Sequence, residues 1–180
     1  MKKIISEIKE QPLDDSEIRA YLGNVPIINY SKFGEIADIM QELRKNPAIV
    51  FLYETSVNRG HWCCLHYLDN NIYFFDSYGD PIDSQLLYNT NTENYDLGQN
   101  KPFLSMLLNK SPCDVWYNDI KFQSDGNNIN TCGRHCINFI LSKDSLLNYG
   151  AKMKKLRKEL GVSYDDIVAI NINKMKNKKM

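Results

Sequence analysis

The run CGRHCINFIL, residues 132–141, carries the clearest structural signal in this chain of 180 residues. It follows a polar, Asn-rich approach from Ser124 to Thr131. The apolar residues of the run recur at helical spacing: Cys136, Ile137, Ile140 and Leu141. A turn-rich approach followed by this pattern indicates a loop that leads into a buried helix. Cys132 would lie in the first helical turn, where unpaired backbone N–H groups and the helix dipole stabilise a thiolate, so we interpret it as a candidate nucleophile.

A β-hairpin is predicted upstream of this helix, from the β-rich runs 61–67 and 72–76. The dipeptide Asp69-Asn70 between them tolerates the positive φ of a two-residue turn. With that turn, His61 and Asp76 lie on the same face of the sheet, with Cβ atoms roughly 7–8 Å apart or less. Moving the turn by one residue keeps them on one face, whereas a three-residue turn separates them. The hairpin therefore predicts that His61 and Asp76 lie within reach of each other.

The rest of the chain predicts helices around a buried sheet. The apolar run from Ala48 to Tyr53 is bounded by turn residues, as in a strand buried on both faces. Further strands are expected at 115–117 and 120–123. Helices are expected at 13–23, 34–45, 102–109, 152–160 and from 163 toward 174. A helix start is expected at 83–87 and a surface loop at 89–101. Gly150 is expected to break the chain. We expect one domain over residues 1–180, with mobile ends at about 1–10 and 175–180.

The composition argues against several classes of protein. Lysine plus arginine and aspartate plus glutamate both number 22, so the formal net charge is zero and no overall basic field attracts nucleic acid. No apolar run approaches the ~20 residues of a membrane span, and the N-terminus lacks a secretory apolar core. Five cysteines at irregular spacing favour free thiols over a disulfide framework. We therefore expect a soluble, intracellular protein with no membrane partner.

A cysteine nucleophile needs a partner, because only the thiolate attacks a carbonyl and a free cysteine is mostly protonated. Of the three histidines, His61 starts a strand at the rim of the sheet, with Asp76 in reach to fix its tautomer. His135 lies on the same helix as Cys132, and His66 lies deeper in its strand. These placements favour His61 as the base.

A donor for the developing oxyanion is also predicted. Gln123 follows a predicted strand and offers an uncharged amide shortly before the cysteine. The backbone N–H of Cys132 would be the second donor. Base, orienting carboxylate, oxyanion donors and nucleophile together are the parts that acyl transfer through a thioester requires.

Four short motifs, in their order along the chain, resemble the adenovirus-type maturation proteases, the adenain family: Gly60-His61-Trp62, Phe74 to Gly79, Phe122-Gln123-Ser124 and Thr131 to Cys136. SUMO-specific proteases of the same clan share this order. The resemblance covers about residues 61–141. It implies a papain-like α+β fold, with a central, mainly antiparallel sheet and the nucleophile at the N-terminus of a buried helix.

Matched position by position, the resemblance implies a catalytic set: His61 as the base, Asp76 as the acidic orienter, Gln123 as the oxyanion glutamine and Cys132 as the nucleophile. Trp62 matches the aromatic residue that lines a narrow channel for a glycine-containing substrate, and Gly133 joins it in the predicted substrate-binding set. Two features depart from the family pattern. The segment between the glutamine and the cysteine is longer, and adenain itself has a glutamate where Asp76 stands.

The resemblance and the compact size together predict a viral, virophage or transposon-encoded maturation protease that cuts structural precursors at Gly-Gly-like sites. Its partners would be protein or peptide substrates, with Lys152–Lys158 as a region for an activating peptide or DNA. The chemistry requires no metal or organic cofactor. We expect the protein in the cytoplasm or nucleus of a host cell, or packaged in a virion.

Two other functions fit parts of the same pattern. A protease for ubiquitin-like modifiers such as SUMO would use the same catalytic set on conjugates. A zinc-binding interaction module would use Cys132 and Cys136 on one helical face, completed by His61, His66 or Cys64. The zinc hypothesis leaves the positions of Asp76 and Gln123 without a role. The basic helix over Lys152–Lys158 also fits an ordinary solvated face.

Overall fold

A computed structural model describes residues 2–126 and 128–179, and its centre is a five-stranded sheet in the order β1-β2-β3-β4-β5. The strands are β1 (Ile27–Asn29), β2 (Ala48–Ser56), β3 (Arg59–Leu68), β4 (Asn71–Phe75) and β5 (Asp114–Tyr117). The inner pairings, β2–β3 and β3–β4, are antiparallel, whereas the edge pairings, β1–β2 and β4–β5, are parallel. The protein is therefore α+β with a mixed sheet: the central strands β2, β3 and β4 pair antiparallel, as predicted, and the two edge strands add parallel pairings. The edge strands are parallel because long crossover segments with helices precede β2 and β5.

The predicted hairpin is confirmed. Leu68 pairs with Asn71 across the β3–β4 ladder, and Asp69 and Asn70 form the turn with φ of 49° and 60°. These positive values suit the right-handed twist of a two-residue hairpin. The register sets the end of β4 beside the start of β3, which is the placement that the candidate site requires.

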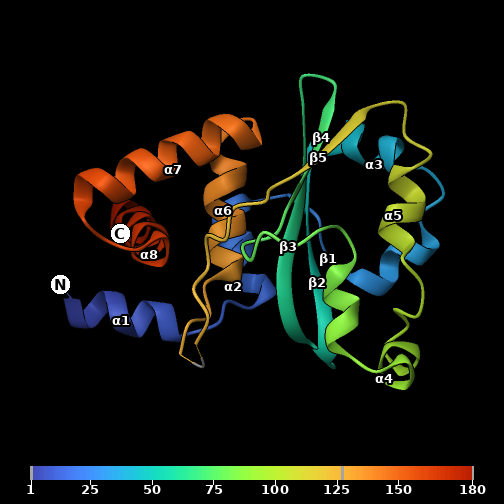
Figure 1. The fold of residues 1–180 in the computed structure, drawn as a ribbon, viewed down its shortest axis with the longest axis horizontal. Helices are drawn as coiled ribbons and strands as arrows, with labels where there is room; N and C mark the ends of the chain where they lie inside the picture. Colours follow the sequence, from blue (N-terminus) through green and yellow to red (C-terminus); the bar gives the residue numbers. More distant parts are fainter. Residues whose placement is uncertain (1, 127, 180) are drawn as a thin grey trace.

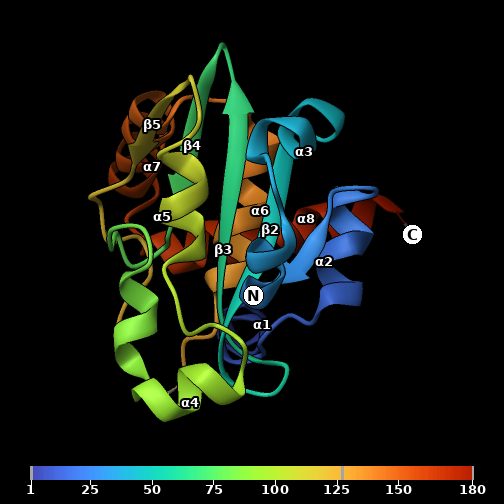
Figure 2. The same ribbon diagram turned by 90° about the vertical axis from the view of Figure 1, so that its right-hand side faces the viewer.

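Both faces of the sheet are covered by helices, as Figures 1 and 2 show. One face packs against α6 (Cys132–Ser142), with α2 (Asp15–Leu22), α7 (Leu146–Leu160) and α8 (Tyr164–Lys179) around it. The other face packs against α3 (Ile39–Lys45), α5 (Phe103–Leu108) and the 3-10 helix η1 (Tyr30–Glu35). Alternate residues of β2 enter the two cores: Ala48, Val50 and Leu52 on the α6 side, and Ile49, Phe51 and Tyr53 on the other. The strand is buried on both faces, as predicted.

Local capping chemistry sets several helix boundaries. Asp14 accepts the N–H of Glu17 (2.8 Å), and the Glu17 carboxylate accepts the N–H of Asp14 (3.0 Å), so a capping box starts α2 where the sequence predicted a helix. The helix expected over 34–45 is shorter. It begins at Ile39 because the Asp38 carboxylate accepts the N–H of Met40 and caps it there.

Three expectations are wrong. Residues 120–123 form no strand, because the N–H groups of Phe122 and Gln123 both donate to the Ser77 carbonyl (2.8 Å each) instead of a ladder. Helix α7 runs through Gly150, where a Cβ would meet Ile120 Cδ1 at 2.9 Å, so the glycine serves close packing and does not end a helix. The surface loop at 89–101 contains helix α4 (Asn91–Asp96), preceded by the 3-10 helix η2 (Ser84–Tyr88).

The two ends of the chain are helical over the residues described, where mobile ends were expected. Helix α1 (Lys2–Glu10) packs beside α8, and Lys9 Nζ lies 2.8 Å from Asp166 Oδ1. Met1 and Met180, which belong to the same prediction, lie outside the described residues. Within 2–126 and 128–179, no helix has both the length and the apolarity to cross a bilayer.

Candidate active site

Three elements meet at one end of the sheet: the start of β3, the end of β4 and the N-terminus of α6. The first two coincide because the strands are antiparallel, and α6 packs across the β3 face with its first residue at this end. The sequence positions they bring together are His61, Asp76 and Cys132. A cavity of about 530 Å³ opens here, and His61, Gln123 and Cys132 line it together with Tyr78. Three of the four predicted catalytic residues thus line one cavity, and the fourth, Asp76, is buried beside His61.

The His61 ring is held by Asp76. Its Nε2 lies 2.7 Å from Asp76 Oδ1, and both side chains are largely or fully buried. The imidazole is also hydrogen-bonded to the Cys132 thiol. Because Nε2 is engaged by Asp76, Nδ1 is the ring nitrogen available to the sulfur. The order carboxylate, imidazole, thiol is the order that nucleophile activation requires.

The electrostatics favour a thiolate facing an imidazolium. Burial alone would lower the pKa of His61, but the Asp76 carboxylate and the Cys132 sulfur outweigh it and raise that pKa to about 10. Burial alone would raise the pKa of Cys132, but the hydrogen bond and charge of His61, with backbone hydrogen bonds at Trp62 and Gly133, lower it. The two shifts run in opposite directions, as in a proton transferred from sulfur to ring.

Asp76 is itself held by neighbours that no sequence pattern marks. Gln85 Nε2 donates to Oδ2 (2.8 Å), and the Tyr78 N–H donates to Oδ1 (2.8 Å). Asn118 accepts the Asp76 N–H at 2.9 Å and donates to the Asp76 carbonyl at 2.6 Å. These bonds hold the carboxylate in one orientation toward His61.

Gln123 lies on the rim of the same cavity, although the predicted strand before it does not form. Its Oε1 accepts the Ser77 hydroxyl (2.8 Å), which leaves the amide Nε2 as the group that faces other acceptors. Nε2 donates to the Ile129 carbonyl at 3.1 Å and to the Tyr78 hydroxyl at 3.3 Å. The oxyanion that forms when Cys132 attacks a substrate carbonyl would compete with these two oxygens for the Gln123 amide.

Tyr78, which belongs to the motif from Phe74 to Gly79, is a site residue for which the sequence predicted no role. Its ring stacks on His61, with centroids 4.6 Å apart and an interplanar angle of 17°. Burial, followed by the nearby charge of Cys132, raises the pKa of Tyr78 to about 12, so the phenol keeps its proton at neutral pH. The neutral aromatic ring of Tyr78 therefore covers one face of the His61 imidazole.

Trp62 and Gly133, the predicted substrate-binding residues, adjoin His61 and Cys132 in the sequence. The Trp62 indole N–H donates to the Leu13 carbonyl (2.9 Å), and its side chain lines a neighbouring groove that meets the first cavity at Gly60 and Asn130. Gly133 is buried, and a Cβ there would lie 3.3 Å from Trp62 Cδ1. The close helix–strand approach at the nucleophile thus depends on the glycine.

The other histidines lie apart from the thiol. His66 packs edge-on against Phe139, with centroids 5.7 Å apart, and His135 Nε2 lies 3.2 Å from Asp165 Oδ1. The residues of the zinc hypothesis are not brought together as predicted. In the part of the chain that the structure describes, the cluster of side chains close enough to share a metal ion is His61, Cys63 and Asp76.

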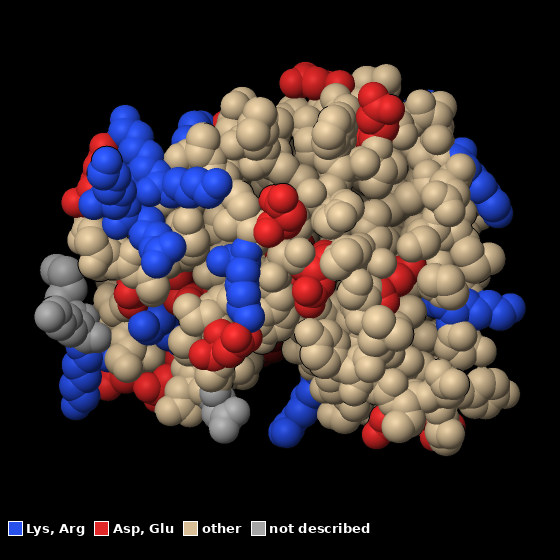
Figure 3. All heavy atoms as spheres, viewed as in Figure 1, with Lys and Arg blue, Asp and Glu red and all other residues tan. Residues whose placement is uncertain are grey.

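The basic region at Lys152–Lys158 forms the exposed side of α7. Figure 3 shows lysine and arginine side chains gathered over this helix, on the far side of α6 from the sheet. Two lysines of α7 are partly neutralised, Lys152 by Asp144 at 2.7 Å and Lys155 by Glu159 at 3.8 Å. A partner at this surface remains a prediction.

The lowered pKa of Cys132 can be measured directly. We expect iodoacetamide to alkylate Cys132 at pH values well below the ordinary range of a thiol, with the rate falling only as the pH drops through the lowered pKa. Cys63 and Cys136 should stay unmodified, because burial raises their pKa values well above the usual range. Peptide mapping by mass spectrometry across pH assigns the site. Equal labelling of Cys136 and Cys132 would contradict the proposed thiolate.

Comparison with known proteins finds a viral protein of similar sequence. No protein-family model matches the sequence. The chain is 42% identical over 116 residues to "Uncharacterized protein V9" of Sputnik virophage, an alignment that covers 64% of this chain and 65%, just under two thirds, of that protein. Among solved structures it is similar to the central domain of the uncharacterized protein Lpg1148 from Legionella pneumophila, with a TM-score of 0.41, 17% identity, and coverage of 94% of this chain and 90% of that one. The sequence is therefore similar to that of a virophage protein.

Proposed function

We propose that this protein is a cysteine endopeptidase of papain-like fold, with Cys132 as nucleophile, His61 as base and Asp76 as orienter. The observation that carries the proposal is the His61 ring held between the Asp76 carboxylate and the Cys132 sulfur at the wall of an open cavity. Packing alone does not require a buried histidine to be bonded on both sides by these two groups. A perturbed thiol and imidazole in a hollow are the usual mark of a reactive pair.

The mechanism follows from the positions of the side chains. The Cys132 thiolate attacks the substrate carbonyl carbon, a C–S bond forms, and the carbonyl oxygen becomes an oxyanion. The Gln123 amide and the Cys132 N–H stabilise that charge. When the tetrahedral species collapses, the C–N bond breaks and His61 Nδ1 gives its proton to the leaving amine. Water, deprotonated by His61, then hydrolyses the thioester and restores the pair.

The proposed substrates are precursor proteins cut at glycine-containing, Gly-Gly-like sites. The motif resemblance supports this class and a role in viral maturation, and the similarity to a virophage protein supports a viral origin. Conjugates of ubiquitin-like modifiers are the competing class, because their C-terminal glycines would meet the same chemistry.

The test offers both classes to the purified protein. We expect cleavage after glycine in peptides drawn from virion structural proteins, with new N-termini identified by mass spectrometry. SUMO, ubiquitin and NEDD8 conjugates are supplied in parallel at equal concentration. Cleavage of conjugates alone would move the assignment to a modifier protease. If no peptide or conjugate is hydrolysed while Cys132 still alkylates rapidly, the endopeptidase proposal is wrong.

A further inference from the structure

Asp165, the second residue of α8, is a fully buried carboxylate far from the catalytic residues in sequence. It binds both ends of the segment 124–131. Its Oδ2 accepts the Ser124 N–H at 3.1 Å, and its Oδ1 accepts the Thr131 hydroxyl at 2.5 Å. One side chain thus connects two points of the chain that lie on either side of a long loop.

Those two points are the immediate neighbours of the proposed oxyanion donors. Ser124 follows Gln123, whose side-chain amide is one donor, and Thr131 precedes Cys132, whose backbone N–H is the other. The two donors belong to different segments, so their separation depends on what joins the segments. The Asp165 carboxylate joins them directly. Donors that stabilise an oxyanion must be held in place before the charge develops.

We propose that Asp165 is the positioning residue of the oxyanion hole, fixing Gln123 relative to the Cys132 N–H from helix α8. The proposal rests on the endopeptidase function proposed above. Asp165 touches neither substrate nor sulfur. It acts through the two backbone segments that it binds.

A simple capping role for Asp165 does not account for these bonds. The first turn of α8 is capped by its neighbour Asp166, whose Oδ2 accepts the Ser163 N–H (3.1 Å) and the Ser163 hydroxyl (2.7 Å). The Asp166 N–H in turn donates to Ser163 Oγ (3.1 Å). Asp165 points away from this cap, toward the loop. Two adjacent acidic residues therefore have separate tasks: Asp166 completes the cap with Ser163 and pairs with Lys9 of α1, whereas Asp165 binds the loop.

The surroundings keep the Asp165 carboxylate ionised. Burial alone would raise its pKa, but hydrogen bonds from His135, Thr131 and Ser124 lower it. Burial lowers the pKa of His135 despite the opposing effect of Asp165, so a neutral His135 donates from Nε2. All three groups around the carboxylate are then donors, which an amide at this position could not satisfy.

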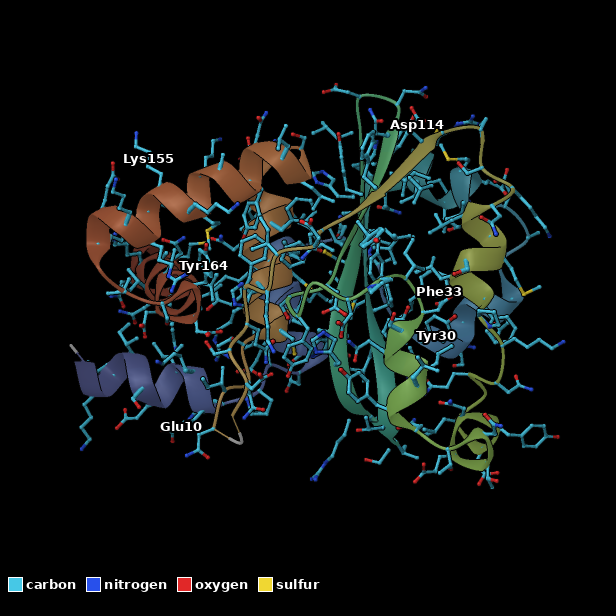
Figure 4. The ribbon with its side chains drawn as sticks, in the orientation of Figure 1. Glu10, Tyr30, Phe33, Asp114, Lys155 and Tyr164 are labelled. Atoms are coloured by element: carbon cyan, nitrogen blue, oxygen red, sulfur yellow. The ribbon has the colours of Figure 1, made fainter. Side chains whose placement is uncertain are left out.

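The loop is also held beside its second anchored end, at Asn130. The Asn130 N–H donates to the Lys9 carbonyl (2.8 Å), and Asn130 Nδ2 donates to the Glu10 carbonyl (2.7 Å). Figure 4 labels Glu10 and also Tyr164, the residue before Asp165, and both lie on the side of α6 turned away from the sheet. The terminal helices α1 and α8 thus hold a catalytic loop that neither of them adjoins in sequence.

The experiment compares two reactions of the same sulfur. Iodoacetamide alkylation needs the thiolate but no oxyanion hole, whereas peptide hydrolysis needs both. For Asp165→Asn we expect an alkylation rate and pH profile within about twofold of wild type. We expect kcat to fall by about 10-fold or more, with KM little changed. The loss should not exceed the roughly 10²–10³-fold that removal of one oxyanion donor costs. Ser163→Ala, which weakens the α8 cap but keeps the Asp165 bonds and the Lys9–Asp166 ion pair, is the control and should retain wild-type kcat.

A double variant tests whether Asp165 acts through the oxyanion hole. If Asp165 acts through the oxyanion hole, Gln123→Ala combined with Asp165→Asn should be hardly slower than Gln123→Ala alone, because residues that act as a unit are not additive. Thr131→Val removes one of the two anchoring bonds with little change of shape and should reproduce the kcat loss in milder form, even if Asp165→Asn folds poorly.

Each possible outcome either supports or overturns the positioning role of Asp165. Unchanged kcat in both Asp165→Asn and Thr131→Val, or alkylation and hydrolysis falling in parallel, would overturn the positioning role while leaving the endopeptidase standing. Multiplicative losses in the double variant would do the same. A wild-type protein that alkylates but hydrolyses nothing would remove the endopeptidase, and the positioning role with it.

Discussion

Cys132→Ala should abolish peptide hydrolysis while leaving the fold intact. Removal of an essential nucleophile lowers kcat by roughly 10⁶-fold in enzymes of this general type, which would place the variant at or below detection. Alanine is the best helix former, so the first turn of α6 should persist. The loss should therefore lie in turnover, with the circular dichroism spectrum unchanged. Turnover of the glycine-containing peptide by equal amounts of both proteins is the measurement.

Cys136→Ala is the matched control, because this second thiol lies one turn further along the same helix. It is fully buried, and its Sγ lies 3.5 Å from the Trp62 carbonyl, so its loss should lower stability modestly and spare kcat. Retained hydrolysis in Cys132→Ala, or equal loss of activity in Cys136→Ala, would show that the sulfur at 132 is not the nucleophile.

The parts of the site that could be predicted are those encoded by local patterns. The Asp69-Asn70 turn fixed the register of the hairpin, and the register alone was enough to place His61 beside Asp76. The apolar spacing after Cys132 likewise encoded helix α6. Both signals span only a few residues, so a single sequence carries them in full.

The parts that could not be predicted depend on contacts between distant segments. Gln85 and Asn118 support Asp76 from a 3-10 helix and a loop, and no periodicity marks either residue. Gly150 looked like a helix breaker, and only the position of the Ile120 side chain explains it. The parallel edge strands depend in the same way on where crossover helices return the chain. Asp165 shows this most clearly, because its partners lie 34 and 41 residues away.

His61→Gln should have an effect almost as large as removal of the sulfur. Glutamine can still donate to Asp76, which limits the cost of leaving that carboxylate buried without its partner. It cannot take or return a proton, and loss of the base in a triad costs about as much as loss of the nucleophile, roughly 10⁶-fold in kcat. Stopped-flow or discontinuous peptide assays with wild type as reference would measure it.

The same variant should also change the reactivity of the thiol. Without the imidazolium, burial dominates at Cys132, so its pKa should rise and iodoacetamide alkylation near pH 7 should slow sharply. In wild type, the rate of hydrolysis should decline as the pH rises through about 10, where His61 loses the proton that the leaving amine needs. Alkylation should show no such decline, because it needs only the thiolate.

His66→Gln is the control for this last prediction, since His66 lies on the same strand but packs against Phe139. It should keep wild-type kcat and the wild-type alkylation profile, with some loss of stability. If His66→Gln or His135→Gln lost hydrolysis while His61→Gln kept it, the base would be a different histidine. If His61→Gln alkylated as fast as wild type at neutral pH, the thiolate would owe its stability to the helix N-terminus and not to the imidazole.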